Sequence, residues 1–390
     1  MKFGFYSCMT GMPWGGSEEL WWRTARKLQV DGDEVCVNYK WWPEMARQLT
    51  RLQDAGGQVW LRDKPDASFW SRFGRARQIL ARRNGPAREW LNQTRPDAVL
   101  VTLGFHPDRI DVASDCRKLG IPYAINVQCA SNTFFIHSDC LEEYRDWYRH
   151  ARRVYFVSEE NRRKMEVNLA MQLDNCEIVA NPFNMKPGDI QQWPDSGGGF
   201  SLACVGRLHF QSKGQDVVIE VFRQPKWRER NLRINFYGSD QGNRRQLEDL
   251  ITMYDLQGQL KYHGFCQRVT DIWADNHGLL LPSRYEGAPL VIVESMLSNR
   301  IAIATDIGRN RELLDDGRTG FIADSATPLQ LDEALERAWQ LRGQWKELGE
   351  AAGQDIRARY TLDPIGDFAS ALRSLVDEPA ARSAAGNGQP

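Results

Sequence analysis

The sequence lacks the features that would place the chain across a membrane or on nucleic acid. No stretch approaches the roughly 18 uninterrupted apolar residues that a membrane-spanning helix needs. The first residues carry no apolar segment of signal-peptide length, so we expect a cytoplasmic protein. Positive charge is not in excess, because 50 Lys and Arg residues face 51 Asp and Glu residues. This balance disfavours a dedicated nucleic-acid-binding protein.

The fingerprints of metal and cofactor sites are also missing from the sequence. The eight cysteines include no C-x-x-C pair, and no group of His and Cys shows the spacing of metal ligands. We therefore expect the cysteines to be small buried hydrophobic residues. No D-x-D follows a predicted strand in the C-terminal half, and neither G-x-G-x-x-G nor a Walker A motif occurs. We expect no metal and no bound cofactor.

What is present is the pattern of an α/β protein. The 390 residues suffice for two domains, and 42% hydrophobic residues is an ordinary globular value. Short apolar runs alternate with helical patterns, which predicts doubly wound parallel sheets. The predicted strands are residues 3–7, 34–38, 58–61, 98–103, 123–128, 154–157 and 177–179, followed by 201–205, 233–236, 261–262, 278–281 and 301–304.

A Pro- and Gly-rich segment interrupts this alternation at residues 184–199 and predicts a linker. We therefore expect two Rossmann-like domains at 1–190 and 198–363, a helix at 364–377 and a disordered tail at 378–390. Parallel sheets bind ligands beyond the carboxyl ends of their strands. The predicted site is the cleft between the two domains.

The most specific group of residues follows the predicted strand 278–281. Glu286 and Glu294 are separated by seven residues, and Pro289 lies between them at a position that suits the start of a helix. The amino end of such a helix can bind an anion, and the two carboxylates can accept hydrogen bonds from sugar hydroxyls. The alternative is that two solvated acids flank an ordinary amphipathic helix.

Two further loops follow predicted strands. Gly206 and Arg207, with Lys213, place two cations at the carboxyl edge of the C-terminal sheet, which suits a diphosphate leaving group. Gly15 and Gly16 follow the first strand and allow a phosphate or a sugar to come close to the backbone. For Arg207 and Lys213 the alternative is that both are ordinary solvated loop residues.

These motifs together resemble those of the GT-B glycosyltransferases of family GT4, which are retaining enzymes that use nucleotide-sugar donors. The resemblance spans most of the chain and is more specific in the C-terminal half. The matching motifs are Gly15-Gly16-x-Glu18, Asn181-Pro182, Gly206-Arg207-Leu208 with Lys213-Gly214, Tyr237-Gly238-Ser239, His263-Gly264-Phe265, the Glu286/Glu294 pair and Asp316-Gly317-Arg318-Thr319-Gly320-Phe321.

The resemblance implies an acceptor-binding N-terminal domain, a donor-binding C-terminal domain, and a last helix that crosses back to the N-terminal domain. It implies that Arg207, Lys213 and Glu286 are catalytic, holding the diphosphate and the donor sugar, and that Glu294 binds the ribose. The remaining implied donor-binding residues are Gly16, Gly206, Gly238, Phe265, Gly287, Ala288, Pro289 and Leu290. The donor is expected to be a UDP- or GDP-sugar rather than an ADP-sugar. The acceptor is a hydroxyl of a saccharide, glycan, lipid-linked or natural-product molecule.

The sequence departs from the family pattern on the acceptor side. Many relatives carry a His after the strand at 123–127, where this chain has Gln128. Gln can form hydrogen bonds but cannot act as a base. A retaining front-face reaction, in which the leaving phosphate takes the acceptor proton, does not need that base. His106 also follows a strand, and it is either an acceptor contact or a loop residue.

A basic stretch within residues 62–95 has helical apolar spacing at its centre, 68–83. It could contact an anionic membrane from the cytoplasmic side, or pack its apolar face on the sheet. Two alternatives to a transferase remain open, a nucleotide-sugar epimerase on the same architecture and a catalytically silent sugar-nucleotide-binding protein. A third, a basic-helix protein that binds nucleic acid, is disfavoured by the balanced charge. The sequence does not indicate the oligomeric state.

Overall fold

The computed structural model describes residues 1–64, 86–105, 108, 110–186, 188–195, 197 and 199–377. The predicted membrane-contacting segment 68–83, His106 and the tail 378–390 lie outside these residues. The chain divides into two compact units, one formed by Met1–Asn181 with the chain from Asp363 onward, the other by Pro182–Leu362. Residues 182–190, expected with the first domain, thus group with the second unit.

In the N-terminal unit, the described residues form a seven-stranded sheet in which every pair of neighbouring strands is parallel, as predicted. The carboxyl ends of the strands therefore share one edge. The strand order is β3 (Gln58–Arg62), β2 (Glu34–Lys40), β1 (Lys2–Ser7), β4 (Ala98–Leu103), β5 (Tyr123–Val127), β6 (Arg153–Phe156) and β7 (Cys176–Ile178).

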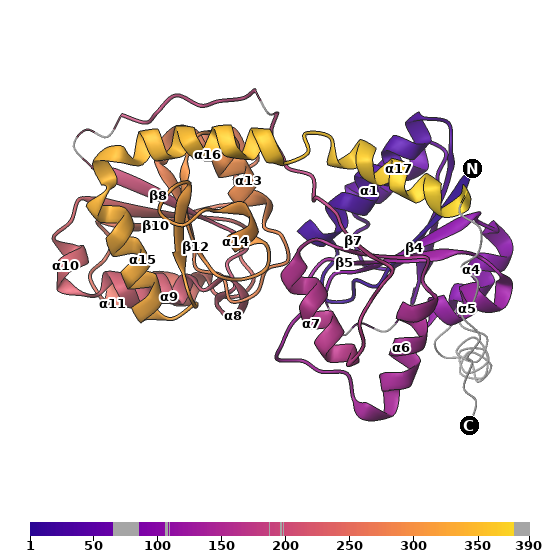
Figure 1. Ribbon diagram of the computed structural model, residues 1–390. Coiled ribbons are helices and arrows are strands. Elements are labelled where there is room, and N and C mark those ends of the chain that lie inside the picture. Colours follow the sequence, from indigo (N-terminus) through magenta and orange to yellow (C-terminus); the bar gives the residue numbers. More distant parts are fainter. Residues whose placement is uncertain are drawn as a thin grey trace. The chain divides into compact units, whose positions relative to one another are not determined.

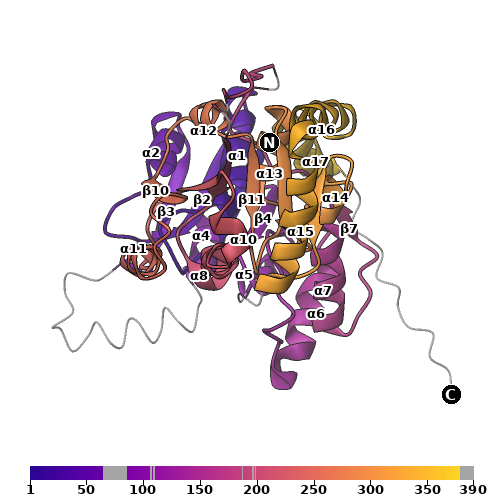
Figure 2. The same cartoon turned by 90° about the vertical axis from the view of Figure 1, so that its left-hand side faces the viewer.

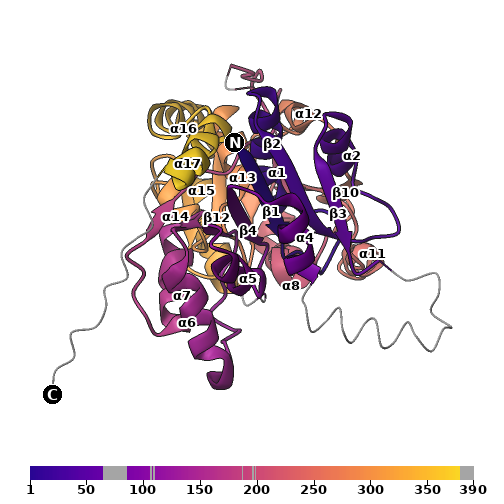
Figure 3. The same cartoon turned by 90° about the vertical axis from the view of Figure 1, so that its right-hand side faces the viewer.

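Helices cover both faces of this sheet (Figures 1 and 3). One face carries α1 (Glu19–Val30), preceded by η1 (Gly16–Glu18), with α2 (Arg47–Asp54) and α17 (Pro364–Asp377). The other carries α4 (Pro86–Thr94), α5 (Val112–Leu119), α6 (Leu141–His150) and α7 (Glu159–Leu169), with η2 (Ser138–Cys140) before α6. Their apolar sides meet the strands in a core that contains Trp90, Trp147 and Met165.

The C-terminal helix α17 packs on the N-terminal unit, which confirms the predicted return of the chain. The Arg373 guanidinium pairs with Asp31 at 2.9 Å and with Asp33 at 2.7 Å, at the end of α1. Phe368 packs edge-on against Tyr155 of β6, with the ring centres 5.0 Å apart. Charge pairing and apolar burial therefore both hold α17 against this sheet.

The second unit contains a six-stranded sheet over the described residues, again parallel throughout. The order is β10 (Leu260–Gly264), β9 (Leu232–Tyr237), β8 (Phe200–Val205), β11 (Gly278–Leu281), β12 (Ile301–Thr305) and β13 (Gly320–Ala323). The sequence predicted the first five of these strands but not β13. This strand has four residues, and the first two of them belong to the motif that begins at Asp316.

Helices again cover both faces, as Figures 1 and 2 show. On one side lie α9 (Gln215–Phe222), α10 (Pro225–Arg228), α11 (Arg244–Met253) and α15 (Pro328–Gln340), around a core that contains Trp227. On the other lie α12 (Val269–Asp275), α13 (Leu290–Leu297) and α16 (Trp345–Arg359), with η3 (Arg342–Gln344) before α16. The short helices α8 (Phe210–Lys213) and α14 (Asn310–Leu313) follow β8 and β12 and so belong to the carboxyl edge.

The predicted burial of the cysteines is right for half of them. Cys8, Cys36, Cys116 and Cys204 are buried, whereas Cys129, Cys140, Cys176 and Cys266 are partly exposed. Each partly exposed cysteine lies in a loop or at the end of an element. All eight are free thiols.

Candidate active site

The carboxyl edge of the C-terminal sheet brings together two of the predicted catalytic residues. Lys213 Nζ lies 2.6 Å from Glu286 Oε1, and the Ser283 hydroxyl donates to the same oxygen at 2.7 Å. The Lys213 and Glu286 side chains are only 17% and 9% exposed. Such shielding strengthens an ion pair relative to one in open water. The site therefore holds a preformed cation–carboxylate pair, fixed further by a serine that the sequence analysis missed.

Backbone contacts between the loops after β8 and β11 hold this pair in place. The amide groups of Arg284 and Tyr285 both donate to the carbonyl oxygen of Ser212, at 2.9 and 3.2 Å. Gly214 has φ +67°, and a Cβ there would lie 2.0 Å from the Pro282 carbonyl oxygen. Only glycine allows the two loops to come this close.

The side chain of Arg284 also connects the loops after β8 and β11. Its guanidinium makes a bidentate pair with Asp216 at the start of α9, with both bonds at 2.8 Å, and donates to the Phe210 carbonyl oxygen at 2.6 Å. The hydrogen bonds to Asp216 raise the pKa of Arg284, which is therefore a permanent cation. Because these contacts face α8 and α9, Arg284 holds the loops together.

Gly206 and Gly238 mark the ends of the neighbouring strands β8 and β9. Gly238 has φ +146°, and a Cβ there would lie 1.9 Å from the carbonyl oxygen of Gly206. The glycine at 238 is thus required by packing. Arg207 follows Gly206, is half-buried, and accepts a hydrogen bond from Gln215 Nε2 on its carbonyl oxygen at 2.9 Å. The structure places Arg207 and Lys213 on the same short connection, as the sequence predicts.

The second glutamate of the pair lies on α13. The helix begins at Leu290 with Pro289 as its N-cap, so Glu294 sits more than one turn inside it, as predicted. Glu294 is 3% exposed, and its Oε1 accepts hydrogen bonds from the backbone N–H and the side-chain amide of Asn184, at 2.9 and 3.0 Å. Asn184 was missed because the surrounding sequence indicates only a linker.

The loop before α13 contains the predicted donor-binding residues Gly287, Ala288 and Pro289, and the predicted Leu290 is the first residue of the helix. This loop packs against the loop after β12, because the Arg309 amide donates to the Gly287 carbonyl oxygen at 2.9 Å. Gly308 has φ +61°, and a Cβ there would lie 2.5 Å from that oxygen. Phe265 follows β10 and is 75% exposed. A large apolar ring at this edge is available for contact with a planar ligand.

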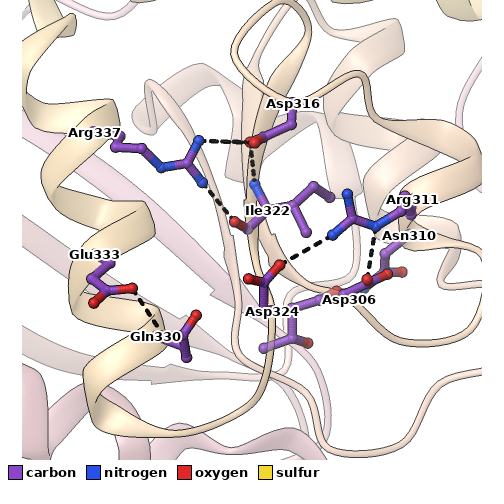
Figure 4. A network of polar contacts seen from close by, with 10 residues as sticks. Asp306, Asn310, Arg311, Asp316, Ile322, Asp324, Gln330, Glu333 and Arg337 are labelled. Carbon is purple, nitrogen blue, oxygen red and sulfur yellow. Dashed lines mark hydrogen bonds and ion pairs between the residues drawn. The ribbon is translucent and has the colours of Figure 1, made fainter.

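Acidic residues at the ends of β12 and β13 are neutralised by arginines (Figure 4). The Arg311 guanidinium bonds to Asp306 at 2.7 Å and to Asp324 at 3.2 Å. Asp316 accepts from the Ile322 amide at 2.8 Å and pairs with Arg337 at 2.9 Å. The motif that begins at Asp316 thus forms the turn into β13 and has a structural role.

In the N-terminal unit, Gly15 and Gly16 lead into η1 at the carboxyl end of β1. A Cβ added at Gly16 would meet no atom within 4 Å, and its φ lies outside the left-handed region. Neither packing nor backbone conformation therefore requires glycine at this position. The open space above Gly16 is suited to a ligand that approaches the backbone.

Gln128 lies at the end of β5 but is buried within a network of amides. Its Nε2 donates to Asn126 Oδ1 at 2.8 Å, and its Oε1 accepts from Asn181 Nδ2 at 2.9 Å. Only 4% of its surface is exposed. Gln128 thus has a structural role that the sequence did not predict. His106, the other predicted acceptor-side residue, lies outside the described residues.

No three His, Cys, Asp or Glu side chains come together as ligands for a metal ion within residues 1–64, 86–105, 108, 110–186, 188–195, 197 and 199–377. None of the helices in that part of the chain is long and apolar enough to cross a membrane.

Comparison with known proteins places the C-terminal unit among glycosyltransferase sequences. Residues 199–340 match the family model of glycosyl transferases group 1. The alpha-D-kanosaminyltransferase of Streptomyces kanamyceticus is 28% identical over 165 residues, which are 42% of this chain and 42% of that protein. A sucrose synthase from Acidithiobacillus caldus is 30% identical over 130 residues, which are 30% of this chain and 16% of that protein. The chain thus matches less than half the length of either relative.

Solved structures resemble the chain over almost its full length. HepE from Anabaena, determined with UDP, has a TM-score of 0.73 at 17% identity, covering 96% of this chain and 100% of that one. A glycosyltransferase from Rickettsia africae has a TM-score of 0.73 at 14% identity, covering 97% and 100%. Sucrose-phosphate synthase from Thermosynechococcus elongatus has a TM-score of 0.70 at 15% identity, covering 96% and 99%. Together with the two parallel sheets, these matches show the two-domain GT-B fold that the sequence predicts.

Proposed function

We propose that this protein is a retaining glycosyltransferase of family GT4 that transfers a sugar from a nucleotide-diphosphate donor to a hydroxyl acceptor. The observation that carries the proposal is the shielded pair of Lys213 and Glu286 at the carboxyl edge of the C-terminal sheet. The pair lies within the residues that match the glycosyl transferases group 1 model. The kanosaminyltransferase and the sucrose synthase support glycosyl transfer as the reaction class.

The chemistry of the pair suits departure of a diphosphate. Lys213 and Arg207 supply positive charge that stabilises the leaving group as its negative charge grows. Glu286 is held by Ser283 and accepts hydrogen bonds from hydroxyls of the donor sugar. The backbone amides between Gly287 and Leu290 lie at the start of α13, where the helix dipole adds to their attraction for an anion.

The nucleoside half of the donor has its own contacts in this proposal. Glu294 accepts hydrogen bonds from the ribose hydroxyls, and the exposed ring of Phe265 lies against the base. HepE was solved with UDP, and this supports a uridine donor over a guanosine one. The acceptor remains a class, the hydroxyl of a saccharide, glycan, lipid-linked or natural-product molecule.

Retention of configuration follows from a front-face reaction in this proposal. The sugar–phosphate bond breaks as the acceptor oxygen bonds to the same face of the anomeric carbon, and the leaving phosphate oxygen takes the acceptor proton. No side chain then needs to act as a base, which agrees with an amide at Gln128. Because Lys213, Arg207 and the α13 amides supply the countercharge, we expect activity to survive EDTA.

A panel of UDP-, GDP- and ADP-sugars in a thermal-shift assay tests donor binding. A donor present at 100 times its Kd stabilises the folded state by about 2.7 kcal/mol. NMR of the product then reports the anomeric configuration. Failure of every donor to stabilise the protein, or an inverted linkage, would contradict the proposal. Conversion of the donor sugar without an acceptor would indicate an epimerase instead.

A further inference from the structure

Two successive glutamates accept hydrogen bonds from three tryptophans beside the Gly15-Gly16 loop. Glu19 accepts from the indole N–H groups of Trp14, at 3.0 Å, and Trp22, at 3.1 Å. Glu18 accepts from the indole N–H of Trp21 at 2.9 Å. The loop residue Trp14 is thereby tied to the start of α1. Glu19 also pairs with Arg23 at 2.8 Å, whereas Glu18 makes no salt bridge within the described residues.

Glu18 is a buried carboxylate with an unsatisfied oxygen. Its side chain is fully buried, and Oε2 accepts from the Ser7 hydroxyl at 2.8 Å as well as from Trp21. Oε1 has no hydrogen-bond partner within the described part of the chain. A buried charge without a close counter-ion is costly. Burial accordingly raises the pKa of Glu18 to about 7.

The titratable groups that face Glu18 come from every element packed around it. Arg62, at the end of β3, favours the ionised carboxylate, whereas the neighbouring Glu19 opposes it. Tyr39 of β2 and Cys8 after β1 also face it, and burial raises the pKa of both groups, so they stay neutral near neutral pH. Arg62 is itself occupied, because it donates to the carbonyl oxygen and the side chain of Asn38.

The same environment holds the Gly15-Gly16 loop. The Tyr39 hydroxyl donates to the Pro13 carbonyl oxygen at 2.7 Å, and the Trp14 ring packs 5.9 Å from the Tyr39 ring and 5.8 Å from the Trp21 ring. Glu18 is the last residue of η1, which starts at Gly16. The Glu18 side chain and the Gly16 backbone therefore belong to the same short turn.

We propose that Glu18 is a positioning residue whose charge state sets the conformation of the Trp14-Gly15-Gly16 loop and, through it, the affinity for the donor diphosphate. The inference rests on the proposed function, together with the donor-binding role that the family resemblance implies for Gly16. With Glu18 protonated, the carboxyl group is neutral and the buried site carries no uncompensated charge. With Glu18 ionised, Oε1 must find water or Arg62, which displaces η1, and the added negative charge repels the diphosphate.

The same proton links the stability of the fold to pH. Because folding raises the pKa of Glu18 above the value of 4.5 in an exposed chain, the folded protein binds this proton more tightly than the unfolded chain. The stabilisation is complete below about pH 4.5 and is lost as the pH rises to about 7. The variant Glu18→Gln keeps an acceptor for Ser7 and Trp21 but has no charge. Its stability relative to the native protein should rise over this range.

Tryptophan emission across the pH range tests the loop directly and needs no ligand. The native protein should show a change with a midpoint near pH 7 that Glu18→Gln abolishes and that the exposed-residue control Glu34→Gln retains. Infrared spectra should show the C=O band of a protonated carboxylic acid disappear with the same midpoint. Ser7→Ala removes one donor to the ionised form, so its midpoint should move to higher pH, and this milder variant serves if Glu18→Gln does not fold. An emission midpoint unchanged in both Glu18→Gln and Ser7→Ala would overturn the proposal.

Calorimetry with UDP-glucose at about pH 6 and about pH 8.5 tests the link to the ligand. In the native protein the affinity should be roughly three- to tenfold lower at the higher pH, and in Glu18→Gln it should not depend on pH. Equal affinities of the native protein at the two values would overturn the link. If no sugar nucleotide of the donor panel binds at either pH, the proposed function fails, while the emission titration still decides whether Glu18 controls the loop.

Discussion

The carboxyl edges of the two sheets carry unlike chemistry. In the C-terminal unit, the loops after β8 and β11 place Lys213 against Glu286 as an ion pair. In the N-terminal unit, the end of β5 gathers neutral amides around Gln128, and the end of β1 holds Glu18 in an aromatic pocket. The Lys213–Glu286 pair thus places opposite charges in contact at one edge, whereas Gln128 at the other is held in a network of uncharged hydrogen bonds.

The glycines of the two edges differ in the same way. At Gly238 a side chain would collide with the backbone of Gly206, so glycine serves the fold. At Gly16 a side chain would enter open space, so packing does not require glycine there. The comparison teaches that a Gly-rich motif alone does not distinguish a packing requirement from a binding one. The atoms around each glycine show whether packing requires it.

The substitution with the largest expected effect is Lys213→Ala. It should lower kcat by about 10²–10³, because it removes positive charge where the diphosphate leaves and strands the Glu286 carboxylate. Steady-state kinetics with the donor identified by the panel measures it. The matched control is Lys226→Ala in the same unit, whose Nζ pairs with Asp332 of α15 at 2.7 Å. Equal losses of kcat in the two variants would contradict a catalytic role for Lys213.

Substitution of alanine at each of the two glycines tests which of them the packing of the fold requires. Gly238→Ala should lower the free energy of unfolding by about 2–3 kcal/mol, because alanine at φ +146° is strained and its Cβ meets the Gly206 carbonyl oxygen. Gly16→Ala should change it by less than about 0.5 kcal/mol but weaken nucleotide-sugar binding. Urea titration and calorimetry measure the two effects. A loss of stability in Gly16→Ala equal to that in Gly238→Ala would show that both glycines serve packing.

A smaller effect is expected at the α13 carboxylate. Glu294→Ala should weaken nucleotide binding about tenfold, because the ribose hydroxyls lose a charged acceptor. Asn184→Ala is the matched control, since it removes an amide that bonds to the same Oε1 at 3.0 Å but leaves the carboxylate in place. It should cost stability while keeping nucleotide affinity within about threefold. If only Asn184→Ala weakened nucleotide binding, the ribose contact would be assigned to Asn184 and not to Glu294.

Sequence patterns predicted the strands that lie beside these sites because each is a short apolar run between helical segments. They also placed Lys213 and Glu286 at one edge, since both follow strands of the same parallel sheet. Contacts between residues distant along the chain were not predictable in this way. Asn184 and Glu294 meet only because the chain after β7 returns to α13, and the sequence near Asn184 indicates a linker.

Glu18 shows a second limit of sequence patterns. An acid at the start of a helix normally indicates a solvated residue that interacts with the helix dipole. Here Trp21 and Tyr39 close around it, and that enclosure depends on packing between α1 and β2. Gln128 shows the same limit, because its burial follows from Asn126 and Asn181, which no local motif connects to it.

The smallest effect on turnover is expected at Gln128. Gln128→Ala leaves Asn126 and Asn181 each without one hydrogen-bond partner, so the free energy of unfolding should fall by about 1–3 kcal/mol. In the proposed reaction the leaving phosphate rather than this amide takes the acceptor proton, so turnover should fall tenfold or less. Gln128→His, which restores the residue that many relatives carry, should retain activity. The pH–rate profile distinguishes the mechanisms: the alanine variant should keep the native profile, whereas a limb that disappears with the amide would show that Gln128 controls a proton transfer at the acceptor edge.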